Sequence, residues 1–171
     1  SFLKENNYEL DEVLFNTLAD AFARAGDIKM VHSIIGDMAK YGVKKNSVLY
    51  SILIRMYSNM GDETKAINSF TEMETEGIKP SLVTYTTLMQ MFIKNKKIQN
   101  AINVFVEMRD KAYKIDQVTY NFIINGCTFN QKLEKAIEFL LESINTGVKL
   151  AMETYNNVIE YLINNKFMKP H

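Results

Sequence analysis

The strongest constraint on this chain is a pattern of residues that recurs every 35 positions along its 171 residues. The segment VTYTTL at 83–88 returns as VTYNFI at 118–123. An aromatic residue marks the same place in every repeat: Phe15, Tyr50, Tyr85, Tyr120 and Tyr155. A fixed period of this length is typical of a repeat architecture, in which each repeat packs on its neighbours.

Each period contains two apolar helical faces. Apolar residues stand three and seven positions after each aromatic residue, and this spacing places all three on one face of a helix. They are Leu18, Phe22, Leu53, Tyr57, Leu88, Phe92, Ile123, Cys127, Val158 and Leu162. A second set, almost entirely apolar, predicts a second helix in each repeat: Val31, Ile35, Met38, Ala66, Phe70, Met73, Ala101, Phe105, Met108, Ala136, Leu140 and Ser143.

Turn residues separate these helices. Gly26 and Gly61 can end the first helix of a repeat, and the aspartate that follows each of them can cap the second helix. Three further glycines are placed to end second helices: Gly42, Gly77 and Gly147. The segments 95–98 and 130–133 contain no glycine, so the period alone predicts turns there.

These patterns predict an all-α solenoid of stacked helix-turn-helix repeats. A single αα-hairpin of this size cannot bury its apolar face, whereas stacked hairpins share one continuous core. The predicted organisation is the tail of a preceding repeat at 1–11, full repeats at 12–46, 47–81, 82–116 and 117–151, and a partial repeat at 152–171. Because neither end resembles a polar cap, we expect either a section of a longer array or a chain whose ends are missing, with the sequence stopping inside a second helix.

Composition argues against several classes of protein. The formal net charge is +0, which predicts no strong attraction of the whole chain to nucleic acid or to an anionic membrane. The one cysteine, Cys127, excludes an internal disulfide framework. No apolar run is long enough to span a membrane, so we expect no membrane partner.

Residues suited to catalysis are scarce. His32 and His171 have no cysteine, carboxylate or second histidine at metal-ligand spacing, so no metal site is predicted. Cys127 falls in an apolar column and lacks a paired base, unlike a catalytic nucleophile. No glycine-rich phosphate loop occurs. We therefore expect no catalytic residues, no cofactor and no small-molecule substrate.

Short polar residues form two further columns, which we call the ladders. The first ladder follows the aromatic residue of each repeat: Asn16, Ser51, Thr86, Asn121 and Asn156. On a helix these side chains point about 100° away from the aromatic residue and so lie off the buried face. The second ladder ends the repeats: Asp11, Asn46, Ser81, Asp116 and Ala151. An alternative explanation is local, because these residue types favour helix caps and short-range hydrogen bonds to the backbone.

The repeat resembles the pentatricopeptide repeat. The residues that carry the resemblance are VTYTTLMQMFIKNKKIQNAINVFVEMRDKAYKID at 83–116 and the preceding repeat with its GIKP ending. The resemblance covers essentially the whole chain. It implies a right-handed superhelix that binds single-stranded RNA, one nucleotide per repeat, in RNA processing, stability, editing or translation in the mitochondrion or plastid.

In that family the two ladder residues of a repeat together read one base. The resemblance implies that Asn16 with Asn46 reads a pyrimidine, and that Thr86 with Asp116 reads a guanine. It also implies that each base lies between apolar residues two positions before the aromatic residue. These are Val13, Val48, Val83 and Val118, whereas Glu153 breaks the column in the last repeat.

Three ladder positions depart from the family's pattern. Ser51 with Ser81 matches none of the common pairs. Asn121 with Ala151 resembles a pyrimidine reader that lacks its second side chain, and Asn156 has no second-ladder partner within the chain.

Backbone contacts to RNA are also implied by the resemblance. The family places a cation near the end of the first helix to meet phosphate, and here Arg24 and Lys94 fit that position. A neutral chain with few aligned cations predicts weak binding at physiological salt. The residues therefore leave a second class open, a structural or scaffold subunit of an organellar ribosome or protein complex that contacts protein or structured RNA.

Overall fold

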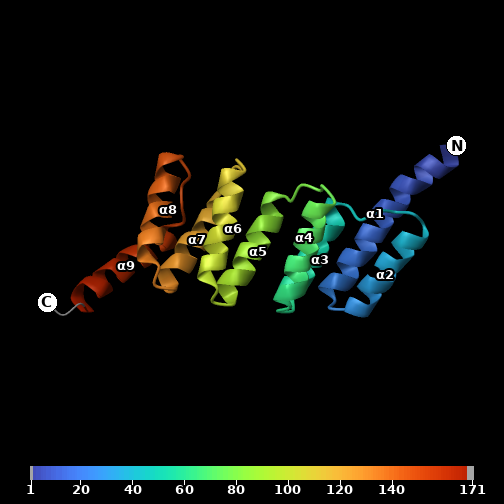
Figure 1. Cartoon of the computed structure of the whole chain (residues 1–171). Helices are drawn as coiled ribbons and strands as arrows, with labels where there is room; N and C mark the ends of the chain where they lie inside the picture. Colours follow the sequence, from blue (N-terminus) through green and yellow to red (C-terminus); the bar gives the residue numbers. More distant parts are fainter. Residues whose placement is uncertain (1, 169–171) are drawn as a thin grey trace. The chain divides into compact units, whose positions relative to one another are not determined.

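The computed structural model describes the backbone of residues 2–168 and the side chains of residues 11–165. Within that range the chain forms nine α-helices joined by short turns (Figure 1). They are α1 (Phe2–Arg24), α2 (Ile28–Lys40), α3 (Ser47–Asn59), α4 (Glu63–Thr75), α5 (Leu82–Lys94), α6 (Ile98–Asp110), α7 (Gln117–Phe129), α8 (Leu133–Asn145) and α9 (Met152–Met168). None of these helices is long and apolar enough to cross a membrane.

The helices pack as stacked hairpins within two compact units, unit 1 at residues 1–87 and unit 2 at residues 88–171. In unit 1, α1 pairs with α2, α3 pairs with α4, and α1 packs on α3. In unit 2, α7 pairs with α8 and also packs on α6 and α9. The predicted all-helical stack of hairpins is therefore confirmed.

The aromatic column forms the core between repeats. Tyr50, Tyr85 and Tyr120 are buried. In unit 1 the ring of Tyr85 lies 5.4 Å from that of Phe70 on the preceding second helix, and in unit 2 the ring of Tyr120 lies 5.6 Å from that of Phe105. The rings of two successive second helices, α4 and α6, therefore each contact the aromatic residue of the next first helix.

Two second-helix positions differ from the prediction. The sequence pattern placed Ile35 and Leu140 in the core, but the structure buries Ile34 and Phe139 and leaves the predicted pair half-buried. The ring of Phe139 lies 4.6 Å from that of Phe105, so aromatic packing buries Phe139 together with the predicted core residues Ala136 and Ser143.

The predicted turns are present, including those without glycine. Gly26 and Gly61 have φ angles of +76° and +75°, and Lys96 and Gln131 take the same left-handed conformation with φ of 59° and 62°. Asp27 and Asp62 cap the following helices, whereas Lys97 and Lys132 at the equivalent positions make no side-chain capping bond. Left-handed backbone is unfavourable for a residue with a Cβ atom, so these two turns are strained.

Glycine at the strained turns should stabilise the protein. We expect Lys96→Gly and Gln131→Gly each to raise the free energy of unfolding by about 0.5–1 kcal/mol, because relief of left-handed strain outweighs the added freedom of the unfolded chain. Gly61→Ala is the reciprocal control, since a Cβ atom there meets nothing within 4 Å and the loss would be conformational. Denaturant unfolding measures all three, and a destabilised Lys96→Gly variant would contradict the assigned strain.

The two ends of the chain differ from the predicted pattern. Asp11 was expected before a helix, but α1 runs unbroken from Phe2 to Arg24, because no glycine or proline interrupts 1–12. The expected final turn into a second helix is also absent from the described residues. There α9 continues to Met168, and the positions equivalent to Gly26 and Asp27 are Lys166 and Phe167.

Candidate nucleic-acid interface

The two ladders meet directly in the first full repeat. Asn16 on α1 donates from Nδ2 to Oδ1 of Asn46 at 3.2 Å. The same Asn46 oxygen accepts the backbone N–H of Leu49 at 2.9 Å and so caps α3. Asn46 Nδ2 in turn donates to a carboxylate oxygen of Glu12. Asn46 therefore caps α3 and also bonds the first-ladder residue of its repeat, while its part in base reading stays a prediction.

The second pair of unit 1 meets through a buried threonine. Ser51 Oγ lies 3.0 Å from Thr84 Oγ1, and Ser81 Oγ lies 3.1 Å from the same hydroxyl. The backbone N–H of Thr84 also donates to Ser81 Oγ at 3.2 Å. Thr84 is 1% exposed, so it contacts both serines from the protein interior and does not face solvent. Sequence reasoning did not single out this threonine.

The third pair is divided between the two units, with Thr86 in unit 1 and Asp116 in unit 2. In unit 1 the Thr86 hydroxyl donates to the carbonyl of Leu82 at 2.8 Å. In unit 2 Asp116 caps α7 by accepting from the N–H of Thr119 at 2.8 Å and from its hydroxyl at 2.6 Å. Joint reading of one base by Thr86 and Asp116 stays a prediction.

Unit 2 holds the fourth pair. Asn121 Oδ1 accepts the backbone N–H of Ala151 at 3.3 Å and the hydroxyl of Thr154 at 2.8 Å. Thr154, 1% exposed, occupies the place in its repeat that Thr84 occupies in unit 1. Asn156, the last residue of the first ladder, is exposed on α9.

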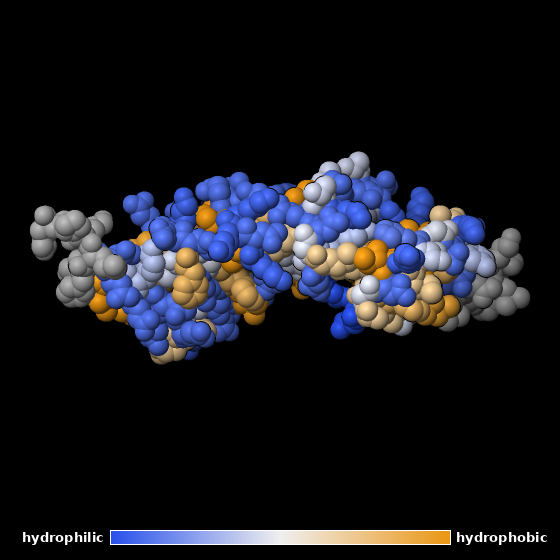
Figure 2. All heavy atoms as spheres, turned by 90° about the horizontal axis from the view of Figure 1, so that it is seen from below, coloured by the Kyte–Doolittle hydropathy of each residue, from blue (hydrophilic) through white to orange (hydrophobic). Residues whose placement is uncertain are grey.

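The valine column lies open to solvent. Val13, Val48, Val83 and Val118 have exposed fractions of 64%, 53%, 71% and 53%. Figure 2 shows a largely hydrophilic face on which apolar residues lie in separate patches. Four exposed valines at one position of the repeat offer flat apolar contacts of the kind that a stacked base uses. Glu153, also exposed, offers no such contact in the last repeat.

A groove in unit 1 brings the ladders and the valine column together. It has a volume of about 500 Å³ and is lined by Asn16, Val48, Ser51 and Ser81 among others. Arg24 and Arg55 line this groove and also a smaller hollow of about 250 Å³. Hydrogen-bonding groups, an apolar side chain and two guanidinium groups therefore share one surface.

Asp20 lies between the two arginines of the groove. Its carboxylate accepts from Nε of Arg24 at 2.9 Å and also from the guanidinium of Arg55. Burial by itself raises the pKa of Asp20, but the hydrogen bonds from Arg55 and Arg24 outweigh burial and hold the pKa below its ordinary value. Arg55 was missed in the sequence, although it stands five positions after an aromatic residue at the place where other repeats carry Gln90 or Asn125.

Lys94 lies on unit 2, exposed at the last turn of α5. The sequence of unit 2 carries 11 lysines and arginines against 8 acidic residues, whereas that of unit 1 carries 9 against 12. The zero net charge therefore conceals an excess of positive charge in unit 2, where Lys96 and Lys97 follow Lys94.

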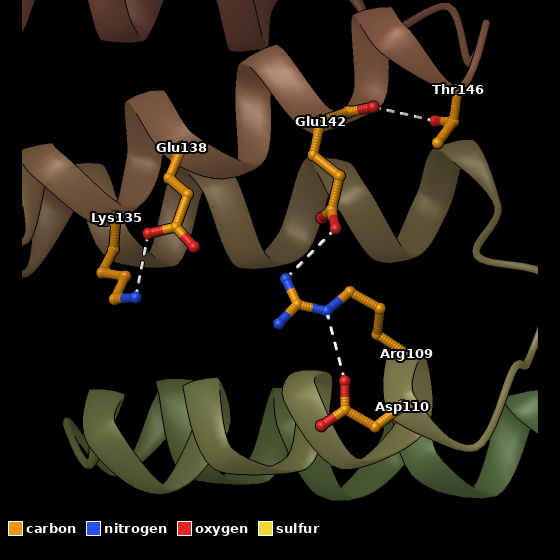
Figure 3. Close-up of polar contacts among 6 residues, drawn as sticks. All are labelled: Arg109, Asp110, Lys135, Glu138, Glu142 and Thr146. Carbon is orange, nitrogen blue, oxygen red and sulfur yellow. Dashed lines mark hydrogen bonds and ion pairs between the residues drawn. The ribbon is translucent and has the colours of Figure 1, made fainter.

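Other basic residues are neutralised on the second helices. Figure 3 shows Arg109 of α6 between Asp110 and Glu142. Arg109 Nη1 lies 3.1 Å from Glu142 Oε1, and Arg109 Nε lies 3.7 Å from Asp110 Oδ1. Lys135 pairs with Glu138 at 2.9 Å on α8. These ion pairs join or cover the second helices, so we do not assign Arg109 or Lys135 to the interface.

Cys127 and the metal-ligating residue types were the remaining candidates for a chemical site. Burial raises the pKa of the Cys127 thiol to about 12, so this buried side chain is not a thiolate at neutral pH. Among the described residues no group of three or more His, Cys, Asp and Glu side chains is placed to hold a metal ion.

Stacked helical hairpins with a 35-residue period and a polar, partly apolar groove define a helical-repeat protein. The chain belongs to the pentatricopeptide repeat family. Models described as the PPR repeat family match residues 45–92 and 80–128, a pentatricopeptide repeat domain model matches 3–60, and a PPR repeat model matches 118–148. No curated protein sequence gives a significant match.

Solved structures give the same fold. Maize PPR10 matches with a TM-score of 0.78 and 22% identity over 91% of this chain and 22% of that one. PPR10 in complex with an 18-nt psaJ RNA element matches with a TM-score of 0.70, at 22% identity over 90% of this chain and 23% of that one. The PPR domain of Arabidopsis thaliana protein-only RNase P 1, in complex with tRNA, matches with a TM-score of 0.77, at 15% identity over 91% of this chain and 82% of that one. The chain thus spans less than a quarter of the length of PPR10.

Proposed function

We propose that this chain binds single-stranded RNA sequence-specifically, one nucleotide per repeat, and serves RNA processing, stability or translation in a mitochondrion or plastid. The observation that carries the proposal is the groove of unit 1, where ladder side chains, Val48 and two arginines line one surface. Two similar structures contain RNA, an 18-nt element in one and a tRNA in the other. The organelle rests on the family resemblance, and the proposed role is binding without catalysis.

The groups of the groove match the parts of a nucleotide. Amides and hydroxyls can bond the edge of an unpaired base, an exposed apolar side chain can lie against its face, and a guanidinium group can meet phosphate. Because the hydrogen-bonding groups recur with the repeat, each repeat offers its own set to one base. Repeat proteins that read one base per helical repeat work in this way.

A second candidate is a scaffold subunit of an organellar ribosome or a protein complex. The observation that favours it is the internal pairing of the groove, since Asn16 bonds Asn46 and Asp20 engages both arginines. A surface whose polar groups already bond one another can bind a protein or a structured RNA through shape complementarity. Binding to short single-stranded RNAs separates the two candidates, because a scaffold would not distinguish their sequences.

Phosphate contacts give a prediction on salt dependence. If Arg24 and Lys94 each meet one phosphate, Arg24→Gln with Lys94→Gln should reduce the slope of log affinity against log salt by roughly 0.7 per lost contact. The preference for base sequence should survive, because phosphate contacts carry no sequence information. Equilibrium binding of a single-stranded RNA at several salt concentrations measures the slope.

Matched variants sharpen that test. Lys29→Gln with Lys135→Gln removes the same charge from the second helices and should leave the slope nearly unchanged. Asp20→Asn should steepen the slope, because it frees Arg24 and Arg55 from their shared carboxylate. An unchanged slope in the Arg24 and Lys94 double variant would remove both residues from the interface and favour the scaffold role.

A further inference from the structure

A relay of hydrogen bonds in unit 2 ends on the ladder residue Asn121. Asn157 Nδ2 donates to Asn125 Oδ1 at 3.2 Å, and Asn125 Nδ2 donates to Thr154 Oγ1 at 3.2 Å. The Thr154 hydroxyl then donates to Asn121 Oδ1 at 2.8 Å. The relay crosses between α7 and α9, and three of its side chains, Asn157, Asn125 and Thr154, belong to neither the ladders nor the valine column.

The direction of this relay is fixed by a backbone group. The N–H of Ala151 can only donate, and it points to Asn121 Oδ1 at 3.3 Å. That atom must therefore be the carbonyl oxygen of the carboxamide, and the Thr154 hydroxyl must donate to it as well. Two donors occupy Asn121 Oδ1, so the amide cannot turn over without breaking both bonds.

The group left to meet a ligand is the Nδ2 donor. Among the residues that the structure describes, Asn121 Nδ2 has no hydrogen-bond acceptor, and it is not one of the buried polar atoms that lack a partner. Ala151 carries no polar side chain to add a second contact. This repeat therefore offers one donor with a fixed orientation.

Asn16, the equivalent asparagine of unit 1, has its carboxamide group in the opposite orientation. Asn46 Oδ1 must accept, because the backbone N–H of Leu49 donates to it, so Asn16 turns Nδ2 toward Asn46. The atom left over is Asn16 Oδ1, which is buried without a partner. One residue type at one position of the repeat is thus held in two orientations by different neighbours.

We propose that Thr154 and Asn125 are positioning residues that determine base specificity at Asn121, a conclusion that rests on the proposed RNA binding. They fix the carboxamide so that Nδ2 faces the RNA and selects a base by an acceptor on its edge. Uracil and cytosine each carry an O2 carbonyl that can accept from Nδ2, in line with the pyrimidine preference that the family resemblance implies for this repeat. Thr154 is buried and does not itself contact the base, so it acts only through Asn121.

The test compares three variants of the whole chain. Thr154→Val removes the hydroxyl at nearly constant volume, and Thr154→Ser restores it. Thr128→Val is the matched control, because Thr128 is equally buried on α7 but its hydroxyl donates to the backbone carbonyl of Ile124, away from the ladder. Each protein is titrated with four single-stranded RNAs that differ only at the nucleotide whose preference changes in Asn121→Ala.

Thr154→Val should reduce the affinity ratio between the best and worst of the four bases by about three- to tenfold, as for one lost orienting hydrogen bond. Thr154→Ser and Thr128→Val should keep the wild-type ratio. NMR of the Asn121 side-chain amide should show a fixed orientation in the wild type and in Thr154→Ser, and averaging in Thr154→Val. An unchanged ratio in Thr154→Val, in a wild type that does discriminate, overturns the positioning role alone. A wild type that binds none of the four RNAs overturns the proposed function and the base reading with it.

Discussion

Replacing Tyr120 by alanine is expected to lower the free energy of unfolding by about 3–5 kcal/mol, the range for removal of a large buried aromatic side chain. Tyr120 is 2% exposed, and its ring lies 5.6 Å from that of Phe105. The substitution removes the contact that joins α7 to the preceding second helix and leaves a cavity that the rigid helices cannot fill. Denaturant unfolding followed by circular dichroism measures the loss.

The neighbouring residue supplies the control for Tyr120. Asn121→Ala removes two hydrogen bonds from a half-buried side chain and should cost about 1–2 kcal/mol. Tyr155→Ala tests the same aromatic column at a half-buried residue. Its loss in the free energy of unfolding should lie between those of Tyr120→Ala and Asn121→Ala. Comparable losses for Tyr120→Ala and Asn121→Ala would show that the buried face of the first helices is wrongly assigned.

Exchanging one ladder pair for another should reverse a base preference. Asn16→Thr with Asn46→Asp gives the first full repeat the pair Thr and Asp that the third repeat carries, so we expect its preference to turn from pyrimidine to guanine. A well-placed set of hydrogen bonds to a base edge is worth about 1–3 kcal/mol of discrimination. Binding of two RNAs that differ at that one nucleotide measures the change.

The exchange at positions 16 and 46 needs one further substitution, at Glu12, in both the parent and the variant. Asn46 Nδ2 donates to Glu12, so a carboxylate at position 46 would be repelled, and parent and variant should both carry Glu12→Gln. Aspartate at 46 can still accept the N–H of Leu49, as Asp116 accepts that of Thr119, so α3 stays capped. An unaltered base preference, together with a loss of about 1 kcal/mol in Asn46→Ala, would mean that Asn46 is only a cap.

The 35-residue period predicted the fold because each part of the hairpin requires particular residue types at fixed positions of the repeat. The aromatic column marks the core, and Gly26 with Asp27 marks a turn that needs left-handed backbone followed by a cap. Lys96 and Gln131 stand where other repeats have glycine, and packing against the neighbouring repeats still requires a turn there. Both residues therefore adopt the strained left-handed conformation. The turn was therefore predictable, but its strain was not.

The interface was less predictable, because its details depend on contacts between repeats. Sequence spacing placed Asn16 and Asn46 in columns but could not show that they bond each other, or that Thr84 and Thr154 hold their neighbours. Arg55 was missed because it breaks the pattern of its column. Only the structure shows that Arg55 lies beside Arg24 and Asp20 in the groove.

The base preference of each repeat can be read by sequencing the RNAs that the whole chain retains from a pool of random single-stranded sequences. Sequence-specific binding should enrich a pyrimidine at one position, guanine two nucleotides further on and a pyrimidine after it, since the first, third and fourth full repeats carry Asn16, Thr86 and Asn121. The enrichment should weaken at the last of these positions alone in Thr154→Val. Retained RNAs that share a fold but no sequence, or a pool that emerges unchanged, would contradict sequence-specific reading of single-stranded RNA.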